Sequence, residues 1–396
     1  MIKKMTQYLL QRRCALSLLL ILMLLHPAVA QAQTRQMYAR LDKETQTLTL
    51  YYGTNYQESD YGISNLIARP LWNTPAERRE IKTVVFDESF KDARPKYCET
   101  WFWCFEALTT IEHLDYLNTS EVDDMHSMFS NCTSLETLDL SSFNTEKVTS
   151  MATMFEKSKN LRSIKLPKGF IGSSVTNLYA MFRGCESLTE LDLSSSNAEK
   201  VTDMMEMFSG CNALSILNLS GFKTGALTDM HSLFINCHSL KNLDLSGFNT
   251  EKVTNMQHLF ASCYSLESLD LSGFNTENVT SMIAMFYNCS SLRSLDLSSF
   301  NTRKVTLMQR MFDECTNLES IDLSSFDTEN MGYMTAMFSS CRKLETLDLS
   351  SFATPNMISM VGAFENCENL KKIYVTSAFT TNKVTEVSHP KIMGQK

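Results

Sequence analysis

The sequence is poor in glycine and proline, and it has no apolar run long enough to cross a membrane. It holds 13 glycines and 7 prolines in 396 residues, which excludes a collagen-like chain and a Pro/Gly-rich disordered chain. Its longest apolar run covers residues 14–25, well short of the ~20 residues that a membrane-spanning helix needs. We therefore predict a globular chain with no membrane span.

Motifs that mark common enzymes are also missing. The sequence has no H-E-x-x-H, G-x-S-x-G, P-loop or G-x-G-x-x-G motif. The histidines beyond residue 30 are scattered, and none lies at a fixed distance from the cysteines, so we expect no shared cluster. We predict no enzymatic activity, no metal site and no cofactor.

The chain has no excess of basic residues. It carries 36 Lys and Arg against 44 Asp and Glu, and its first thirty residues contribute four basic residues and no acidic ones. Without that segment the net charge is 32 − 44, or −12, at neutral pH. This balance argues against nucleic acid or an anionic membrane surface as the main partner.

The N-terminal segment has the pattern of a secretory signal peptide. Lys3, Lys4, Arg12 and Arg13 precede the apolar run, and small-x-small triplets between residues 28 and 32 fit a cleavage site. We assign residues 1–32 to this signal and expect a secreted or cell-surface protein. Cys14 precedes the apolar run rather than following it, so we do not expect a lipid anchor.

Nine cysteines mark a repeat of 26 residues, which is typical of a solenoid of stacked units. The step is constant from Cys185 onward, Ser158 occupies the position after Cys132, and one residue is inserted near residues 169–174. The nine are Cys132, Cys185, Cys211, Cys237, Cys263, Cys289, Cys315, Cys341 and Cys367.

Each repeat contains two hydrophobic patterns. In residues 266–289, Leu269 and Leu271 flank Asp270 with period two, which predicts a short strand. Residues 279–289 place apolar side chains at steps of three, three, one and three, which predicts a short helix, with Thr280 as its cap. Stacked repeats would align one phenylalanine each into a spine, formed by Phe129, Phe155, Phe182, Phe208, Phe234, Phe260, Phe286, Phe312, Phe338 and Phe364.

The repeat resembles that of the bacterial surface leucine-rich-repeat proteins of the BspA type, in the subgroup with 26-residue repeats. The motifs that carry the resemblance are L-D-L-S-S-F-N-T-E-K-V-T at residues 138–149 and M-F-x-x-C-x-S-L at residues 285–292. The resemblance implies a secreted or surface-displayed protein that binds host or microbial macromolecules, and it leaves the ligand open.

We predict an α/β solenoid of the leucine-rich-repeat type, with parallel strands on its concave face, short helices behind them and an N-terminal β-hairpin as a cap. About twelve coils would cover residues 81–385, after a cap in residues 33–80 and before a tail in residues 386–396. The cap is expected because the outer face of a terminal coil is otherwise bare apolar surface.

The periodic cysteines have two interpretations. Exported proteins often carry disulfides, and adjacent coils would bring these Cα atoms close enough for pairing. However, eleven cysteines follow the signal segment, an odd number, and we place Ser158 and Leu108 at the same repeat position. We therefore favour buried free thiols over a ladder of disulfides.

A row of aspartates is the candidate binding site. The residues stand between inward-facing leucines, so they point out from the strand face, where like charges about 5 Å apart repel. They either organise the following turn through Ser neighbours or form an acidic ribbon for a basic protein segment or Ca²⁺. The row is interrupted by Lys165, Asn218 and Tyr374, and its members are Asp139, Asp192, Asp244, Asp270, Asp296, Asp322 and Asp348.

The most direct functional interpretation is an adhesin-like module that binds host extracellular or bacterial surface proteins through this face. A self-associating envelope scaffold without a foreign ligand is the alternative, because the repeats are nearly uniform.

Overall fold

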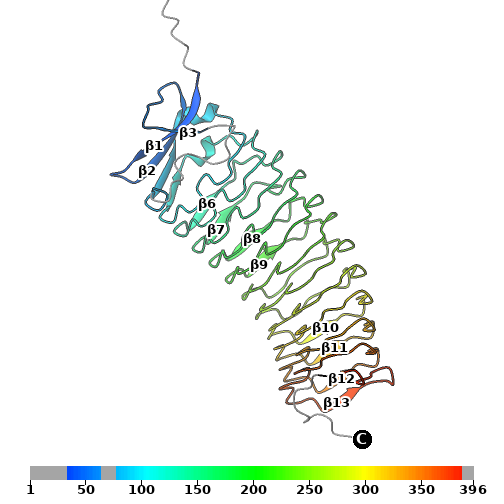
Figure 1. Cartoon of the computed structure of the whole chain (residues 1–396). Helices are drawn as coiled ribbons and strands as arrows, with labels where there is room; N and C mark the ends of the chain where they lie inside the picture. Colours follow the sequence, from blue (N-terminus) through cyan, green and yellow to red (C-terminus); the bar gives the residue numbers. More distant parts are fainter. Residues whose placement is uncertain (1–33, 64–76, 386–396) are drawn as a thin grey trace, which may run out of the picture.

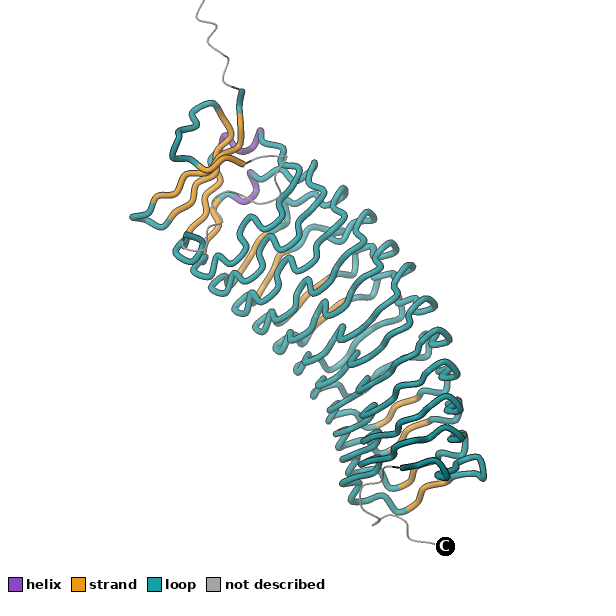
Figure 2. Tube along the Cα trace, in the orientation of Figure 1, coloured by secondary structure: helices purple, strands orange, loops and turns teal. Residues whose placement is uncertain are grey.

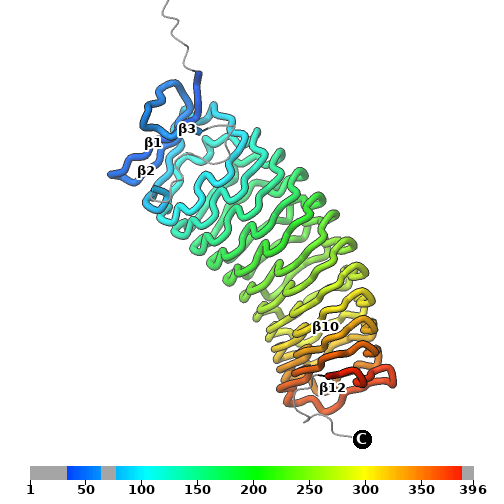
Figure 3. Tube along the Cα trace, viewed as in Figure 1, coloured from blue at the N-terminus to red at the C-terminus, as the bar shows by residue number. Residues whose placement is uncertain are grey.

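The chain winds into a solenoid whose coils stack along a curved axis from the N-terminal to the C-terminal end (Figures 1 and 3). The computed structural model describes residues 34–63 and 77–385. The predicted signal segment 1–32 and the tail 386–396 lie outside these residues, and the domain boundaries stay predictions. Within the described ranges, no helix is both long and apolar enough to cross a membrane.

The regular elements are short strands joined by turns. Two 3-10 helices, η1 (Glu88–Asp92) and η2 (Leu114–Tyr116), are the helical elements of the described residues. The strands are β1 (Gln36–Asp42), β2 (Thr47–Gly53), β3 (Tyr61–Ile63), β4 (Thr83–Phe86), β5 (Thr110–Glu112), β6 (Thr137–Asp139), β7 (Ser163–Lys165), β8 (Glu190–Asp192), β9 (Ile216–Asn218), β10 (Ser294–Asp296), β11 (Ser320–Asp322), β12 (Thr346–Asp348) and β13 (Lys372–Tyr374).

The N-terminal segment extends the sheet of the first coils instead of folding as a separate hairpin. Strands β1 and β2 pair antiparallel, β3 adds to the outer side of β1, and β2 pairs in parallel with β4. The result is a five-stranded sheet in the order β3-β1-β2-β4-β5. Leu48 and Leu50 are fully buried against the solenoid core. A two-stranded hairpin cap is therefore too simple a description.

The predicted helix behind each strand is wrong. In the segment 282–289, every second backbone N–H donates to a carbonyl of the next coil, and the N–H groups of Met285, Tyr287 and Cys289 close turns onto carbonyls three residues earlier. The inter-coil bonds run from the N–H of Met282, Ala284, Phe286 and Asn288 to the carbonyls of Leu307, Gln309, Met311 and Asp313, at 2.8, 2.9, 3.0 and 2.7 Å.

Two left-handed residues per coil explain why this segment is not a helix. Ala284 and Asn288 have φ values of 52° and 55°, and an α-helix does not accommodate such residues. The apolar spacing fits a run of turns as well as a helix, so it did not distinguish them. The residue before the cysteine did carry a signal, because Asn and Gly favour this conformation. It is Asn131, Gly184, Gly210, Asn236, Asn288 and Asn366 in six of the coils.

The coils have two hydrogen-bonded ladders, and the continuous one lies outside the predicted strands. Bridges link residues 97, 124, 150, 177, 203, 229, 255, 281, 307, 333 and 359 without a gap. The predicted strands pair only as β6–β7, β8–β9, β10–β11 and β12–β13 beyond the first sheet. Residues 242–244 and 268–270 form no strand in the part of the chain that the structure describes. Figure 1 shows this stretch between β9 and β10, and Figure 2 draws it as teal loops.

The predicted phenylalanine spine is confirmed. Neighbouring rings from Phe129 to Phe364 stack with centroid distances of 5.2–5.9 Å. Phe102 continues the stack at 5.4 Å from Phe129. Because each unit is too small to bury its own apolar side chains, this column supplies a core shared by all coils.

Buried hydroxyl groups add a second contact between coils. Thr250 is 1 % exposed; its Oγ1 donates to the Asn275 carbonyl at 2.9 Å and accepts from the Asn275 N–H at 2.8 Å. The exposed Thr280 does not cap a helix, because its hydroxyl donates to the Thr254 carbonyl at 3.2 Å. Repeated threonines thus join one coil to the next.

Candidate functional site

The seven predicted aspartates all lie exposed on the strand face of the solenoid. Five of them end strands β6, β8, β10, β11 and β12, and Asp244 and Asp270 hold the same repeat position in coils without a strand. In each strand the residue before the aspartate points inward, as Leu295 does at 3 % exposure. The alternation of the sequence therefore places the carboxylates as predicted.

Each aspartate organises the turn that follows it. One carboxylate oxygen, Oδ1, accepts a hydrogen bond at 2.9 Å from the backbone N–H of the serine two residues later. This is the local arrangement by which Asp side chains stabilise turns. The turn-forming role is present, and it leaves the outer side of each carboxylate facing solvent.

These contacts favour the ionised carboxylates. The side chain of Ser141, its N–H and Lys165 lower the pKa of Asp139 to about 2. The following serines also lower the pKa of Asp244, Asp270, Asp296 and Asp348. Hydrogen bonds to the charged form of an acid have this effect. These five carboxylates are therefore negatively charged at neutral pH.

Five consecutive coils present an aspartate without an ionic partner. Asp139 pairs with Lys165 at 3.0 Å, but no ion pair among the described residues reaches the other six aspartates. From Asp244 to Asp348 no coil interrupts the row. The register places Asp296 directly beside Asp322, and strands that pair this way are about 4.8 Å apart.

Two open hollows lie along this run. One has a volume of about 790 Å³ and is lined by Asp296, Asp322, Asp348 and the serines beside them. The other, of about 640 Å³, is lined by Asp244, Asp270, Asn242 and Ser268 with Leu217, Leu243 and Leu269. We call residues 242–244, 268–270, 294–296, 320–322 and 346–348 the acidic groove.

Apolar side chains stand at both ends of the acidic groove. Ile216 is 61 % exposed and precedes it, and Tyr374 is 50 % exposed and follows it. Tyr374 was predicted as an interruption of the row. Ile216 was not singled out, although its position holds the polar Glu190 and Asn242 in the two neighbouring coils.

The cysteines that the structure describes are all free, and the repeated thiols form a ladder of their own. No disulfide joins the eleven described cysteines. Each repeated thiol donates to the carbonyl of the spine phenylalanine in the preceding coil, as Cys263 Sγ does to Phe234 at 3.2 Å. Ser158 makes the same bond to Phe129 at 2.7 Å, which explains why serine replaces cysteine there.

One detail of the cysteine alignment was wrong. Phe105, and not Leu108, occupies the cysteine position of the first coil, because the Leu108 N–H donates to the Phe105 carbonyl as the Leu135 N–H does to Cys132. A larger side chain fits there since the coil adjoins the N-terminal sheet. The position therefore requires burial and tolerates different sizes at the end of the stack.

Native thiol labelling is expected to separate Cys104 from the ladder. Burial raises the pKa of Cys211, Cys263 and Cys315 to about 12, and the thiolate is the form that alkylating reagents attack. Cys104 is only half-buried, as is Cys367 at the end of the ladder. Mass spectrometry after iodoacetamide treatment of native, unreduced protein should show these two modified first and the fully buried ladder thiols unmodified. Equal labelling rates, or inter-coil disulfides, would contradict this thiol arrangement.

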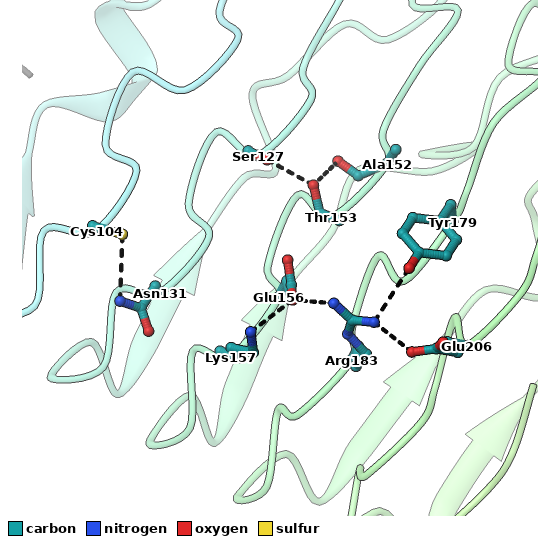
Figure 4. Close-up of polar contacts among 10 residues, drawn as sticks. All are labelled: Cys104, Ser127, Asn131, Ala152, Thr153, Glu156, Lys157, Tyr179, Arg183 and Glu206. Atoms are coloured by element: carbon teal, nitrogen blue, oxygen red, sulfur yellow. Dashed lines mark hydrogen bonds and ion pairs between the residues drawn. The ribbon is translucent and has the colours of Figure 1, made fainter. Parts of the chain in front are cut away.

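A cluster of charged side chains on the turn side is satisfied internally. Arg183 binds Glu156 and Glu206 from the coils on either side, and Glu156 also contacts Lys157 at 3.2 Å (Figure 4). The Tyr179 hydroxyl accepts from Arg183 at 3.3 Å. Opposite charges here meet each other, so the cluster links coils rather than offering a binding site.

Stacking does bring two histidines together, contrary to the expectation of scattered residues. The rings of His231 and His258 meet edge to face with centroids 5.8 Å apart. Residues 34–63 and 77–385 contain no group of three His, Cys, Asp or Glu side chains placed to hold a metal ion.

Three bacterial leucine-rich-repeat proteins are among the solved structures that match this chain. A leucine-rich cell surface protein of Faecalibacterium prausnitzii is 17 % identical, with 86 % of this chain and 93 % of that chain covered and a TM-score of 0.38. A leucine-rich-repeat protein of Bacteroides ovatus is 16 % identical, with 89 % and 92 % covered and a TM-score of 0.39. One of Eubacterium ventriosum is 15 % identical, with 84 % and 92 % covered and a TM-score of 0.37.

Comparison with curated proteins gave no match. A family model described as "Mycoplasma protein of unknown function, DUF285" matches residues 101–217, 163–269, 206–317 and 291–390. Together these overlapping matches cover most of the chain and all the regular coils. The chain therefore belongs to the DUF285 family.

Proposed function

We propose that this is an exported repeat protein, secreted or held at the cell surface, that binds a host or microbial surface protein along its acidic groove. The five consecutive aspartates without ionic partners carry the proposal. Solenoids present long binding surfaces of this kind. The signal-like segment, residues 1–32, supports export.

The chemistry of the groove favours an extended segment rich in Lys or Arg. Its carboxylates are exposed, ionised and regularly spaced, so each adds a weak contact, and a ligand gains affinity by spanning several coils. Electrostatic attraction also raises the rate of association with a basic partner. A net charge of −12 beyond the first thirty residues works in the same direction.

Exposed apolar side chains next to the groove would anchor the bound segment. Ile216 and Tyr374 lie at its two ends, and aromatic anchors commonly dominate binding energy. Tyr264 and Tyr333 are also exposed, at 38 % and 39 %, but they belong to the turn side. The groove therefore combines a charged centre with apolar ends.

Neutralising the groove tests the proposal. The triple variant Asp244→Asn, Asp270→Asn and Asp296→Asn is expected to weaken binding of a fluorescent decalysine peptide about 10-fold, since exposed ion pairs contribute ~0.2–1 kcal/mol each. Fluorescence anisotropy at low and high salt measures it, and salt should weaken wild-type binding too. The wild-type protein and the triple variant are then used as baits to capture extracellular-matrix and bacterial surface proteins.

A matched control removes the same charge elsewhere. Three glutamates outside the groove are exposed and form no ion pair: Glu251, Glu277 and Glu329. Changing them to Gln should leave peptide affinity unchanged. If both triple variants lost peptide affinity equally, the loss would come from the change in net charge and not from the groove. Unchanged affinity of the folded Asp→Asn variant would refute a binding role for the row, and Ca²⁺ added in a parallel titration tests the cation alternative.

The second candidate is a self-associating scaffold, favoured by the near-uniformity of the repeats. A site tuned to one ligand usually breaks a repeat, whereas the acidic groove repeats Asp with Ser or Thr beside it over several coils. Analytical ultracentrifugation distinguishes the two. A concentration-dependent ordered oligomer in the absence of ligand supports the scaffold, and a monomer supports the binding module.

A further inference from the structure

We infer that residues 229–271 form an acid-sensitive joint in the solenoid, controlled by the contact between His231 and His258. The inference is independent of the proposed binding function. It rests on two features of the same coils: a histidine pair on the turn side and a missing strand ladder on the opposite side.

The first feature is the geometry of the histidine pair. His231 and His258 come from adjacent coils, and their rings meet at 5.8 Å with an interplanar angle of 88°. Both side chains are half-buried. The backbone around His258 is fixed, because its N–H donates to the Ile283 carbonyl at 2.9 Å and its φ is 55°. The backbone that carries the His258 ring is therefore held in the ladder.

Arg310 is a charged group that disfavours a positive charge on His258. One repeat position holds His258, Ala284 and Arg310 in three successive coils. Between His258 and Arg310, the intervening coil therefore presents only the methyl group of Ala284 at this position. Arg310 binds Asp313 at 2.8 Å.

On the other side of the pair, the carboxylates are already engaged. Asp229 accepts the His231 N–H at 2.7 Å and an Asn255 amide hydrogen at 3.3 Å. The Glu206 side chain, one coil earlier, binds Arg183. No carboxylate in the described coils forms an ion pair with either imidazole.

Acid shifts the pair toward repulsion. Burial, then His231 and Arg310, lower the pKa of His258 from 6.5, so the folded state favours the neutral ring. The stability that depends on a neutral His258 ring is therefore complete above about pH 6.5 and declines as the pH falls below it. A positive charge on His258, against the His231 ring, then disfavours the close contact between adjacent coils.

The second feature makes these coils the place where separation costs least. The continuous ladder is intact here, but the strand-face segments 242–244 and 268–270 form no strand. Between these two segments there is one inter-coil backbone hydrogen bond near the strand position, which the Glu267 N–H donates to the Lys241 carbonyl at 3.3 Å. Regions with fewer hydrogen bonds open locally at lower free energy.

Hydrogen exchange of the full chain tests the joint at about pH 7.5 and about pH 5, with rates corrected for the intrinsic effect of pH. Protection of residues 230–236 and 256–262 is expected to fall at least about 10-fold more on acidification than that of residues 308–314. Equal changes in all three segments would overturn the inference.

Three variants give the test its specificity. His231→Gln should preserve the fold, since Gln257 and Gln309 hold the same position in other coils. His258→Asn suits the left-handed backbone conformation at this residue. Each should abolish the extra acid loss. His126→Gln, at the repeat position of His231 but without a histidine neighbour, should behave as wild type. Persistent acid loss in the folded His231→Gln variant would also refute the joint.

Discussion

Phe234→Ala is expected to lower the free energy of unfolding by about 3–5 kcal/mol, the usual cost of removing a buried phenylalanine. Phe234 has no exposed surface, and its ring stacks between Phe208 and Phe260 at 5.5 and 5.7 Å. Truncation leaves a cavity that two coils border, and both coils are held in place by the turn ladder. Urea denaturation followed by circular dichroism measures the loss.

The end of the same column provides the control. Phe364 is half-buried and stacks on Phe338 alone, at 5.9 Å, so Phe364→Ala should cost less than about 2 kcal/mol because less apolar surface is lost. In a repeat protein, stability is close to a sum of unit and interface terms. Equal losses at the two positions would mean that the spine does not act as a shared core.

Gly221→Ala is expected to destabilise the protein by about 3 kcal/mol, at the upper end of the cost of overpacking. A Cβ atom at this position would lie 1.9 Å from the Ser194 carbonyl oxygen of the preceding coil. That oxygen belongs to backbone, so neither partner moves without separating two coils. Gly247→Ala should also destabilise the protein, because its Cβ would lie 2.3 Å from the Phe222 carbonyl oxygen.

Gly273→Ala is the matched control at the same repeat position. A Cβ there meets nothing within 4 Å, so the change should be neutral or stabilise by up to about 1 kcal/mol through the unfolded chain. Serines at this position in other coils, such as Ser325, have room to bond the preceding coil at 3.0 Å. If all three alanine variants were equally stable, the close approach of these coils would not be real.

The proposed binding surface follows from the same regularity that fixes the fold. The spacing of one aspartate per coil creates the acidic groove, and the absence of Lys or Arg partners from Asp192 onward leaves it open to a ligand. The repeat therefore provides the acidic groove. A ligand would gain specificity from Ile216 and Tyr374, which interrupt the repeat at its two ends.

The sequence alone determined the repeat, the register of its columns and the direction of its side chains. The 26-residue period placed Phe234 beside Phe260 and Asp296 beside Asp322, because stacking turns a constant spacing into a column. Alternation around Asp296 was enough to place its carboxylate on the surface. The odd number of cysteines and Ser158 were enough to favour free thiols.

The tertiary structure alone decided how the backbone between these columns is hydrogen-bonded. The spacing of Met282, Met285 and Phe286 fits a helix, but a helix satisfies its N–H groups locally, whereas this chain donates half of them to the next coil. That choice depends on a neighbour 26 residues away, which no local pattern reports. The same is true of the broken strand ladder and of the contact between His231 and His258, since both arise only when the coils are stacked.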